Sequence, residues 1–195
     1  MVLIQKTEVI DILIKSFSHN ERILSILHPS KEKALYWFFN YVFELVQSIG
    51  DFFVTKCGSN IILYYRNSRR KHNLKSTIAL LRLILNSNIS KLWTTLSFNK
   101  KVSEIRNQEA HSNSESDFIY VWFLAGNKSS EGYAGFTDIK EYVRNLGAKS
   151  RLSIYMETTI PRMLPIYRRA GFKFYKQEVI NNTTIWFGKY DHNGK

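Results

Sequence analysis

Small and polar residues gather between two apolar segments past the middle of the chain, and their types suit the binding of an anion. A glycine-bearing loop between a buried strand and a helix leaves backbone N–H groups free, and the helix dipole favours negative charge there. Small residues also let an oxygen atom approach the backbone closely. The pattern predicts a phosphate-binding loop, with a plain tight turn as the alternative. The candidate residues are Ser129, Ser130, Glu131, Gly132, Tyr133, Ala134 and Gly135.

The elements on either side of this loop follow from the hydrophobic pattern. Residues 118–125 form a continuous apolar run, which is typical of a strand covered on both faces. After the loop, apolar residues recur at helical spacing until Gly147, where we expect the helix to end. A second strand, a short helix and two further strands follow, so a helical crossover joins two neighbouring strands. These later elements are predicted at residues 152–156, 161–170, 172–175 and 183–187.

The first part of the chain is predicted to be rich in helices. Polar residues 107–116 carry no apolar period and are expected to form a loop. We expect one domain over residues 1–195, with a helix-rich half at 1–107 and a ligand-binding half at 117–190. The first half is predicted to contain helices at 8–17, 34–49, 74–85 and 89–106, and a strand hairpin at 51–56 and 61–66.

One stretch resembles a known family. Residues 156–175, METTIPRMLPIYRRAGFKFY, contain Glu-Thr, then Pro-Arg, then Leu-Pro-x-Tyr, closed by Gly-Phe. With the apolar run and the glycine-bearing loop before it, this stretch resembles the C-terminal half of the GNAT acetyltransferases. It is most similar to the branch that includes puromycin N-acetyltransferase. The resemblance covers about residues 118–177, and residues 1–107 agree with the family only in layout.

The resemblance implies an α/β fold of the GNAT type, with a central mixed, mostly antiparallel sheet flanked by helices. It also implies acetyl-CoA as the co-substrate. By this resemblance, the backbone of Phe123, Leu124 and Ala125 at the end of the central strand would pair with the pantetheine arm. The loop from Ser129 to Ala134, which includes Ser130, Glu131, Gly132 and Tyr133, would receive the pyrophosphate.

The same resemblance assigns two catalytic side chains. Tyr167 matches a tyrosine near the thioester sulfur, where a phenol of reference pKa about 10 would protonate a thiolate whose conjugate acid is near 8.5. Glu157 matches an acidic residue on the acceptor side and would accept the amine proton through water. A backbone N–H near a strand bulge would polarise the carbonyl. The alternatives are packing under the sheet for Tyr167, a local hydrogen bond for Glu157, and either core packing or an acceptor pocket for residues 36–43.

The glycine-bearing loop departs from the family pattern of Gln or Arg, two residues, Gly, one residue, and Gly or Ala. Without a gap, Glu131 takes the place of the Gln or Arg, and the following helix is about a turn short. If the following helix is aligned with the family's helix instead, Gly132 becomes the last glycine of the family motif and the loop is several residues shorter than in the family. Met163 also replaces an asparagine that the family has early in the next helix. Both registers stay open.

The composition is that of a basic globular protein with a formal net charge of +12. Such a charge suits nucleic acid, a membrane surface or an anionic small molecule as partner. Cys57 is the only cysteine, which excludes an internal disulfide and suits a reducing compartment. Histidine spacing predicts no metal site, and the apolar runs are broken by charge before the ~20 residues of a membrane span. We expect a cytoplasmic protein that binds neither metal nor membrane. The densest basic cluster, either a solvated connection or a phosphate contact, is Arg66, Arg69, Arg70, Lys71, His72 and Lys75.

Three functions are therefore compared. The first is an N-acyltransferase that moves an acetyl group from acetyl-CoA to a primary amine of a small molecule or peptide. The second is a catalytically silent GNAT-fold module that binds CoA or regulates, which the altered loop favours. The third is a basic nucleic-acid-binding protein, which rests on charge alone because no nucleic-acid-binding motif is present. A monomer and a homodimer are both compatible with the sequence.

Overall fold

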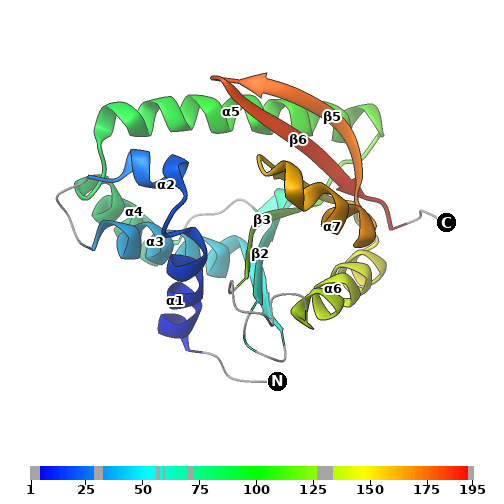
Figure 1. The fold of residues 1–195 in the computed structure, drawn as a ribbon, viewed down its shortest axis with the longest axis horizontal. Coiled ribbons are helices and arrows are strands. Elements are labelled where there is room, and N and C mark those ends of the chain that lie inside the picture. The colour runs from blue at the N-terminus through cyan, green and yellow to red at the C-terminus, as the bar shows by residue number, and fades with distance from the viewer. Residues whose placement is uncertain are drawn as a thin grey trace.

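The computed structural model describes residues 5–28, 33–55, 58, 60–69, 73–126 and 134–192 of the chain. One six-stranded sheet runs through the molecule in the order β1-β2-β3-β4-β6-β5 (Figure 1). Neighbouring strands are antiparallel except β3 and β4, which are parallel. The predicted mixed, mostly antiparallel sheet is therefore confirmed. The strands are β1 Gly50–Val54, β2 Asn60–Arg66, β3 Ile119–Gly126, β4 Ile154–Thr158, β5 Lys173–Ile180 and β6 Thr183–Tyr190.

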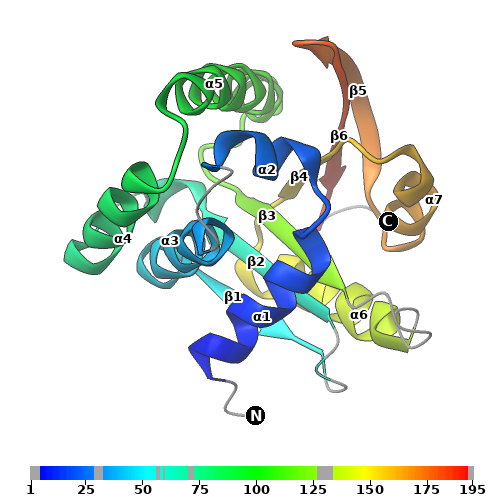
Figure 2. The same cartoon turned by 60° about the vertical axis from the view of Figure 1, so that its left-hand side comes forward.

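Helices cover both faces of the sheet. In Figure 2, α1 and α3 lie over one face of β2 and β3, and α6 lies on the other side. Ile61 and Leu63 of β2 pack with the α1 and α3 side chains, whereas Ile62 packs with Ile139 and Val143 of α6. This alternation is what a strand buried on both faces requires. The α-helices are α1 Lys6–Phe17, α2 Glu21–Ile26, α3 Ala34–Ile49, α4 Leu74–Leu85, α5 Ile89–Ser112, α6 Ala134–Ser150 and α7 Leu164–Arg169.

Two predicted helix ends are wrong. α5 continues through residues 107–112, where we expected a loop. The last turns touch the body mainly through Arg106 and Ala110, so the helix shows little apolar periodicity there. α6 continues past Gly147 and ends at Ser150, before Arg151 with a φ of 56°. Gly147 is needed for packing instead, because a Cβ there would lie 3.0 Å from the Tyr190 ring.

The strands predicted at 172–175 and 183–187 are confirmed as β5 and β6, which are both longer than predicted and form a hairpin. Asn181 and Asn182 form its two-residue turn, with φ values of 49° and 60°. Left-handed conformations at both positions define the turn type that matches the twist of a hairpin, and asparagine tolerates them well.

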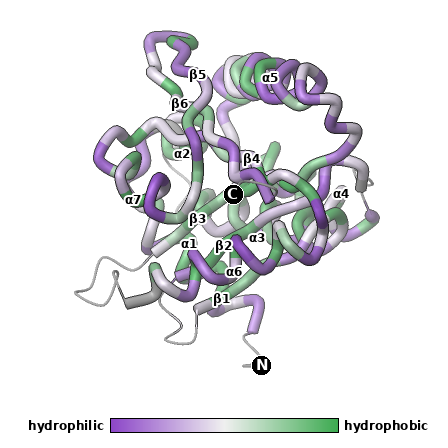
Figure 3. The backbone as a smooth tube through the Cα atoms, turned by 90° about the vertical axis from the view of Figure 1, so that its right-hand side faces the viewer, coloured by the Kyte–Doolittle hydropathy of each residue, from purple (hydrophilic) through white to green (hydrophobic). Residues whose placement is uncertain are grey.

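α5 stands apart from the layered core. Figure 3 shows it above the sheet with polar and apolar residues mixed along its length. Its middle is held by Phe98 and Val102, which pack against Ile185 and Phe187 of β6. Its N-terminal part contacts α2. Within the ranges that the structure describes, no helix is both long and apolar enough to cross a bilayer.

Candidate functional site

The two parallel strands in the middle of the sheet pair over a short distance only. Ile119 pairs with Ile154 and Tyr120 with Tyr155, and the register ends there. Beyond these positions β3 continues alongside β2 and β4 continues alongside β6. The facing edges of residues 121–126 and 156–158, all of them described, do not pair with each other. The strands therefore open into a wedge that has backbone edges on two sides.

A bulge in β3 lies at the inner end of this wedge. Tyr64 of β2 pairs with Val121 and Leu63 pairs with Phe123, so Trp122 is an extra residue on β3. A bulge of this kind turns side chains and backbone groups out of the regular alternation. Trp122 and Phe123 consequently pack on the same face, with the α1 and α3 side chains.

The three residues predicted to hold the pantetheine arm are divided between the faces. The Phe123 ring lies among Phe17, Phe38 and Phe39, with its centroid 5.3 Å from that of Phe17. Ala125 lies on the same face in the same core. The Leu124 side chain lies on the opposite face, against α6 and α7. Only Leu124 of these three shares a surface with Tyr167, although the backbone of all three runs along the wedge.

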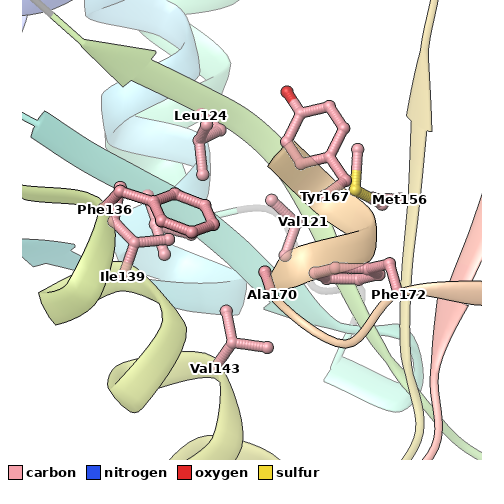
Figure 4. Close-up of a pocket in the computed structure, with 10 residues that line it drawn as sticks. Val121, Leu124, Phe136, Ile139, Val143, Met156, Tyr167, Ala170 and Phe172 are labelled. Atoms are coloured by element: carbon pink, nitrogen blue, oxygen red, sulfur yellow. The ribbon is translucent and has the colours of Figure 1, made fainter. Parts of the chain in front are cut away.

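Tyr167 lies under the sheet beside the wedge. Figure 4 shows its ring between Leu124 of β3 and Met156 of β4, with the hydroxyl directed away from a small apolar cavity. That cavity holds about 20 Å³, room for one water molecule at most, so it is a packing gap rather than a substrate site. Burial raises the pKa of Tyr167 to about 12, and a hydrogen bond with Thr158 acts in the opposite direction.

Glu157 lies on the other face of β4 and is held by an ion pair. Its Oε1 accepts a hydrogen bond from Arg106 Nη1 of α5 at 2.7 Å, and both side chains are less than one-tenth exposed. The Arg106 guanidinium stacks on the Tyr120 ring, 3.7 Å from its centroid. Burial lowers the pKa of Arg106, but Glu157 and Tyr120 outweigh that effect and keep it fully charged. Burial and the Glu157 carboxylate raise the pKa of Tyr120 well above its ordinary value.

A cleft of about 600 Å³ opens beside this ion pair, between α5, α3 and the sheet. Its volume lies within the range of pockets that bind small organic ligands. The walls are mainly aromatic and aliphatic near the sheet and polar along α5. Residues that line it include Tyr41, Tyr65, Leu96, Arg106, Tyr120 and Trp122.

The structure describes the positions of some of the predicted site residues and does not describe others. Glu157 and Tyr167 both lie near the end of β4, but on opposite faces of the sheet, so the structure does not bring them together. Residues 127–133 of the predicted phosphate loop, and Arg70 to His72 of the basic cluster, lie outside the described residues. Ala134 begins α6. Within segment 36–43, Phe39, Val42 and Phe43 are core residues, whereas Tyr41 lines the cleft.

Sequence reasoning missed Arg106, Tyr120 and Trp122. Arg106 comes from the polar C-terminal part of α5, and its burial depends on a partner 51 positions away. The bulge at Trp122 leaves no mark in a run that is apolar at every position. No local sequence pattern links an arginine on one helix to a glutamate at the end of a distant strand, so the pair could not be predicted from the sequence.

Neither a protein-family model nor a curated protein matches the sequence. Solved structures match almost end to end at low identity. An acetyltransferase related to histone acetyltransferases from Corynebacterium glutamicum is 13% identical with a TM-score of 0.60, over 100% of this chain and 96% of that one. The C-terminal condensation domain of Ebony, solved with β-alanyl-dopamine, is 11% identical with a TM-score of 0.64, over 94% and 92%.

A third match gives the same result. A polyamine N-acetyltransferase of Drosophila melanogaster is 12% identical with a TM-score of 0.58, over 95% of this chain and 94% of that one. Structural similarity at such low sequence identity establishes the fold alone. The chain has the α/β fold that acetyltransferases of the GNAT type share.

Proposed function

From this GNAT fold, we propose that the chain is an N-acyltransferase that moves an acetyl group from acetyl-CoA to an amine. The observation that carries the proposal is the wedge between β3 and β4, with the Trp122 bulge at its inner end. An extended, amide-containing arm fits between two unpaired strand edges, because it supplies the missing donors and acceptors. Within the superfamily, the motif in residues 156–175 favours the branch that includes puromycin N-acetyltransferase.

The co-substrate would lie along the wedge. Phe123, Leu124 and Ala125 would bind the pantetheine arm through their backbone. The pyrophosphate would be held by Ser129, Ser130, Glu131, Gly132, Tyr133 and Ala134. That second assignment rests on the sequence, and it is supported by the start of α6 at Ala134, because a helix N-terminus favours an anion.

The reaction requires that the amine nitrogen bond to the carbonyl carbon, that the carbon–sulfur bond break, and that the amine proton end on sulfur. The thioester supplies the activated acyl group. A backbone N–H at the bulge would stabilise the charge that develops on the carbonyl oxygen. Tyr167 would hydrogen bond to the leaving sulfur and give it a proton while receiving one released by the amine. Its pKa of about 12 keeps the phenol protonated throughout the physiological range.

The acceptor would approach from the opposite face of the sheet. The 600 Å³ cleft borders Arg106 and Tyr120, and both of these contact Glu157. A cleft of that size, with aromatic walls, suits a small amine with an apolar body better than a folded protein. Glu157 would attract the ammonium form and take its proton through water. Arg106 and Tyr120 would fix the carboxylate in place.

The altered loop supports a second candidate. If an acidic side chain faces the pyrophosphate, like charges weaken CoA binding and favour a GNAT-fold module without turnover. The two candidates differ in catalysis more than in binding, so the experiment must measure both.

The test is a thermal-shift panel with CoA, acetyl-CoA and longer acyl-CoAs, followed by release of free thiol in the presence of amines. A ligand at a concentration of a hundred times its Kd raises the free energy of unfolding by about 2.7 kcal/mol, and this raises the Tm of a chain of this length by about 5–10 °C. We expect such a shift with acetyl-CoA, and thiol release that depends on a small amine. A shift without release supports the silent module. No shift at millimolar acyl-CoA, together with a flat calorimetric titration, contradicts both candidates.

A further inference from the structure

α4 carries an exposed apolar stripe on the side that faces away from the protein. Its core side consists of Ser76, Ala79 and Leu83, which are all buried. At 100° per residue, a second set of apolar side chains lies directly opposite. A helix with an apolar face on each side is expected to be covered on both. The exposed members are Leu74 (76% exposed), Ile78 (42%), Leu81 (57%) and Leu85 (71%).

The stripe continues onto the first turns of α5. Leu85 and Ile89 flank the short turn between the helices, so the two stripes meet at that corner. Ile89 is 61% exposed and Trp93, one turn further along, is 70% exposed. Figure 2 shows α4 at the edge of the molecule, projecting away from the sheet. We refer to Leu74, Ile78, Leu81, Leu85, Ile89 and Trp93 as the α4–α5 surface.

The sequence around this surface contains no negative charge. No Asp or Glu occurs between Asp51 and Glu104. This one segment therefore carries most of the net charge of +12. Lys75, Arg82 and Lys91 are exposed on the same two helices as the apolar stripe. The basic residues of the segment are Lys56, Arg66, Arg69, Arg70, Lys71, Lys75, Arg82, Lys91, Lys100 and Lys101.

We propose that the α4–α5 surface docks onto an anionic lipid bilayer. Leucine, isoleucine and tryptophan side chains enter the boundary between headgroups and acyl chains, and neighbouring lysines and arginines bind anionic headgroups. Tryptophan favours this boundary because its ring is apolar and its N–H is polar. α4 is about 18 Å long at 1.5 Å per residue, which suits a helix lying in the plane of the interface.

Two other occupants fit the surface less well. Nucleic acid would use the cations but has no partner for six exposed apolar side chains, because its contacts are dominated by phosphate. A second copy of the chain would bring two segments without acidic residues against each other, and like charges oppose that contact. The sequence predicted no membrane partner, because its apolar runs are broken by charge before the ~20 residues of a membrane span, and a helix that lies in the interface needs no such run.

Co-sedimentation with vesicles tests the proposal without reference to catalysis. One set contains phosphatidylcholine with about 30% phosphatidylserine, and the other phosphatidylcholine alone. We expect binding to the mixed vesicles at about 0.1 M salt, much weaker binding at about 1 M, and little binding to phosphatidylcholine. Trp93→Glu and Leu81→Glu should each weaken binding at least tenfold. Replacing Lys75 and Lys91 together with Gln should weaken it roughly 30-fold, at about 1 kcal/mol for each cation.

Val179→Glu is the matched control, because Val179 is 63% exposed on β5, outside the α4–α5 surface. It should change binding by less than twofold. The substituted side chains are exposed, so every variant should keep its Tm and circular dichroism spectrum. The proposal is overturned by binding that Trp93→Glu does not change, or by duplex DNA bound where vesicles are not. A dimer that Trp93→Glu dissociates, without vesicle binding, would assign the surface to a second copy.

Discussion

Two charged side chains from distant parts of the sequence meet at the end of β4, beside the cleft that we propose for the acceptor. Arg106 and Glu157 are buried, hydrogen bonded and flanked by Tyr120. Removal of one partner would strand the other charge away from water, whereas removal of both avoids this cost. The pair is therefore expected to contribute to stability, and the catalytic role proposed for Glu157 must be measured separately from that contribution.

The two contributions can be separated by a double-mutant cycle. Glu157→Gln and Arg106→Gln should each destabilise the fold by about 3–5 kcal/mol. The double variant should lose less than the sum of the two, because no buried charge remains unpaired. Denaturant unfolding measures both quantities, and additive losses would show that the ion pair does not act as a unit. In the double variant, turnover that stays low despite recovered stability would support the role of Glu157 as a proton acceptor.

Tyr167 provides the second prediction at this scale. Tyr167→Phe keeps the ring between Leu124 and Met156 and removes only the hydroxyl. If the phenol protonates the leaving sulfur, thiol release should fall by about 10²–10⁴-fold while the acetyl-CoA shift in Tm is kept. An equal loss of binding and rate would mark the residue as structural.

The pH profile of the wild-type protein checks the same role. An acid with a raised pKa is protonated below that pKa and loses its proton only above it. The wild-type rate should therefore not decline up to about pH 10, because the Tyr167 pKa is about 12.

At the scale of elements, the sequence predicted what depends on local pattern. The strand at 118–125, the α4 boundaries and the β5–β6 hairpin were recovered because apolar periodicity and turn residues define them. The short helix α2 and the extension of α5 were missed, because their residues are held by contacts with distant segments. A strand bulge was expected from the family resemblance, but its position at Trp122 was not, since the extra residue exists only relative to β2.

The end of α7 gives a prediction about one such local feature. Gly171 has a φ of 101°, and a Cβ there would lie 2.8 Å from the Tyr190 ring. Gly171→Ala should therefore destabilise the fold by about 2–3 kcal/mol, the sum of a strained backbone and displacement of a ring. Gly58→Ala is the matched control, because Gly58 has a φ of 68° with no described atom within 4 Å of that Cβ. It should cost about 1 kcal/mol in denaturant unfolding. Equal losses of stability in the two variants would mean that the Tyr190 ring can move aside at no cost.

For the whole molecule, the net charge of +12 acts on any anionic substrate at long range. The Debye length falls from about 10 Å at 0.1 M salt to about 3 Å at 1 M. The Kd of acetyl-CoA should therefore rise about tenfold over this range by isothermal titration. The acetyl thioester of cysteamine capped on its nitrogen has no charge, and its binding should change less than twofold. A salt response shared by both ligands would point to changes in the protein rather than to attraction of the phosphates.

The wedge between β3 and β4 also determines how the molecule would come apart. Two paired positions form the whole seam between the strand group β1-β2-β3 and the group β4-β6-β5. The rest of the connection is made by side chains: α6 packs with β2, β3 and β4 in one core cluster, and α5 packs on β6 and contacts α2. Proteins open locally in contiguous cooperative units, and we expect the two strand groups to be two such units. A pantetheine arm that hydrogen bonds to both β3 and β4 would join the two strand groups. Binding of the co-substrate would then also oppose their separation.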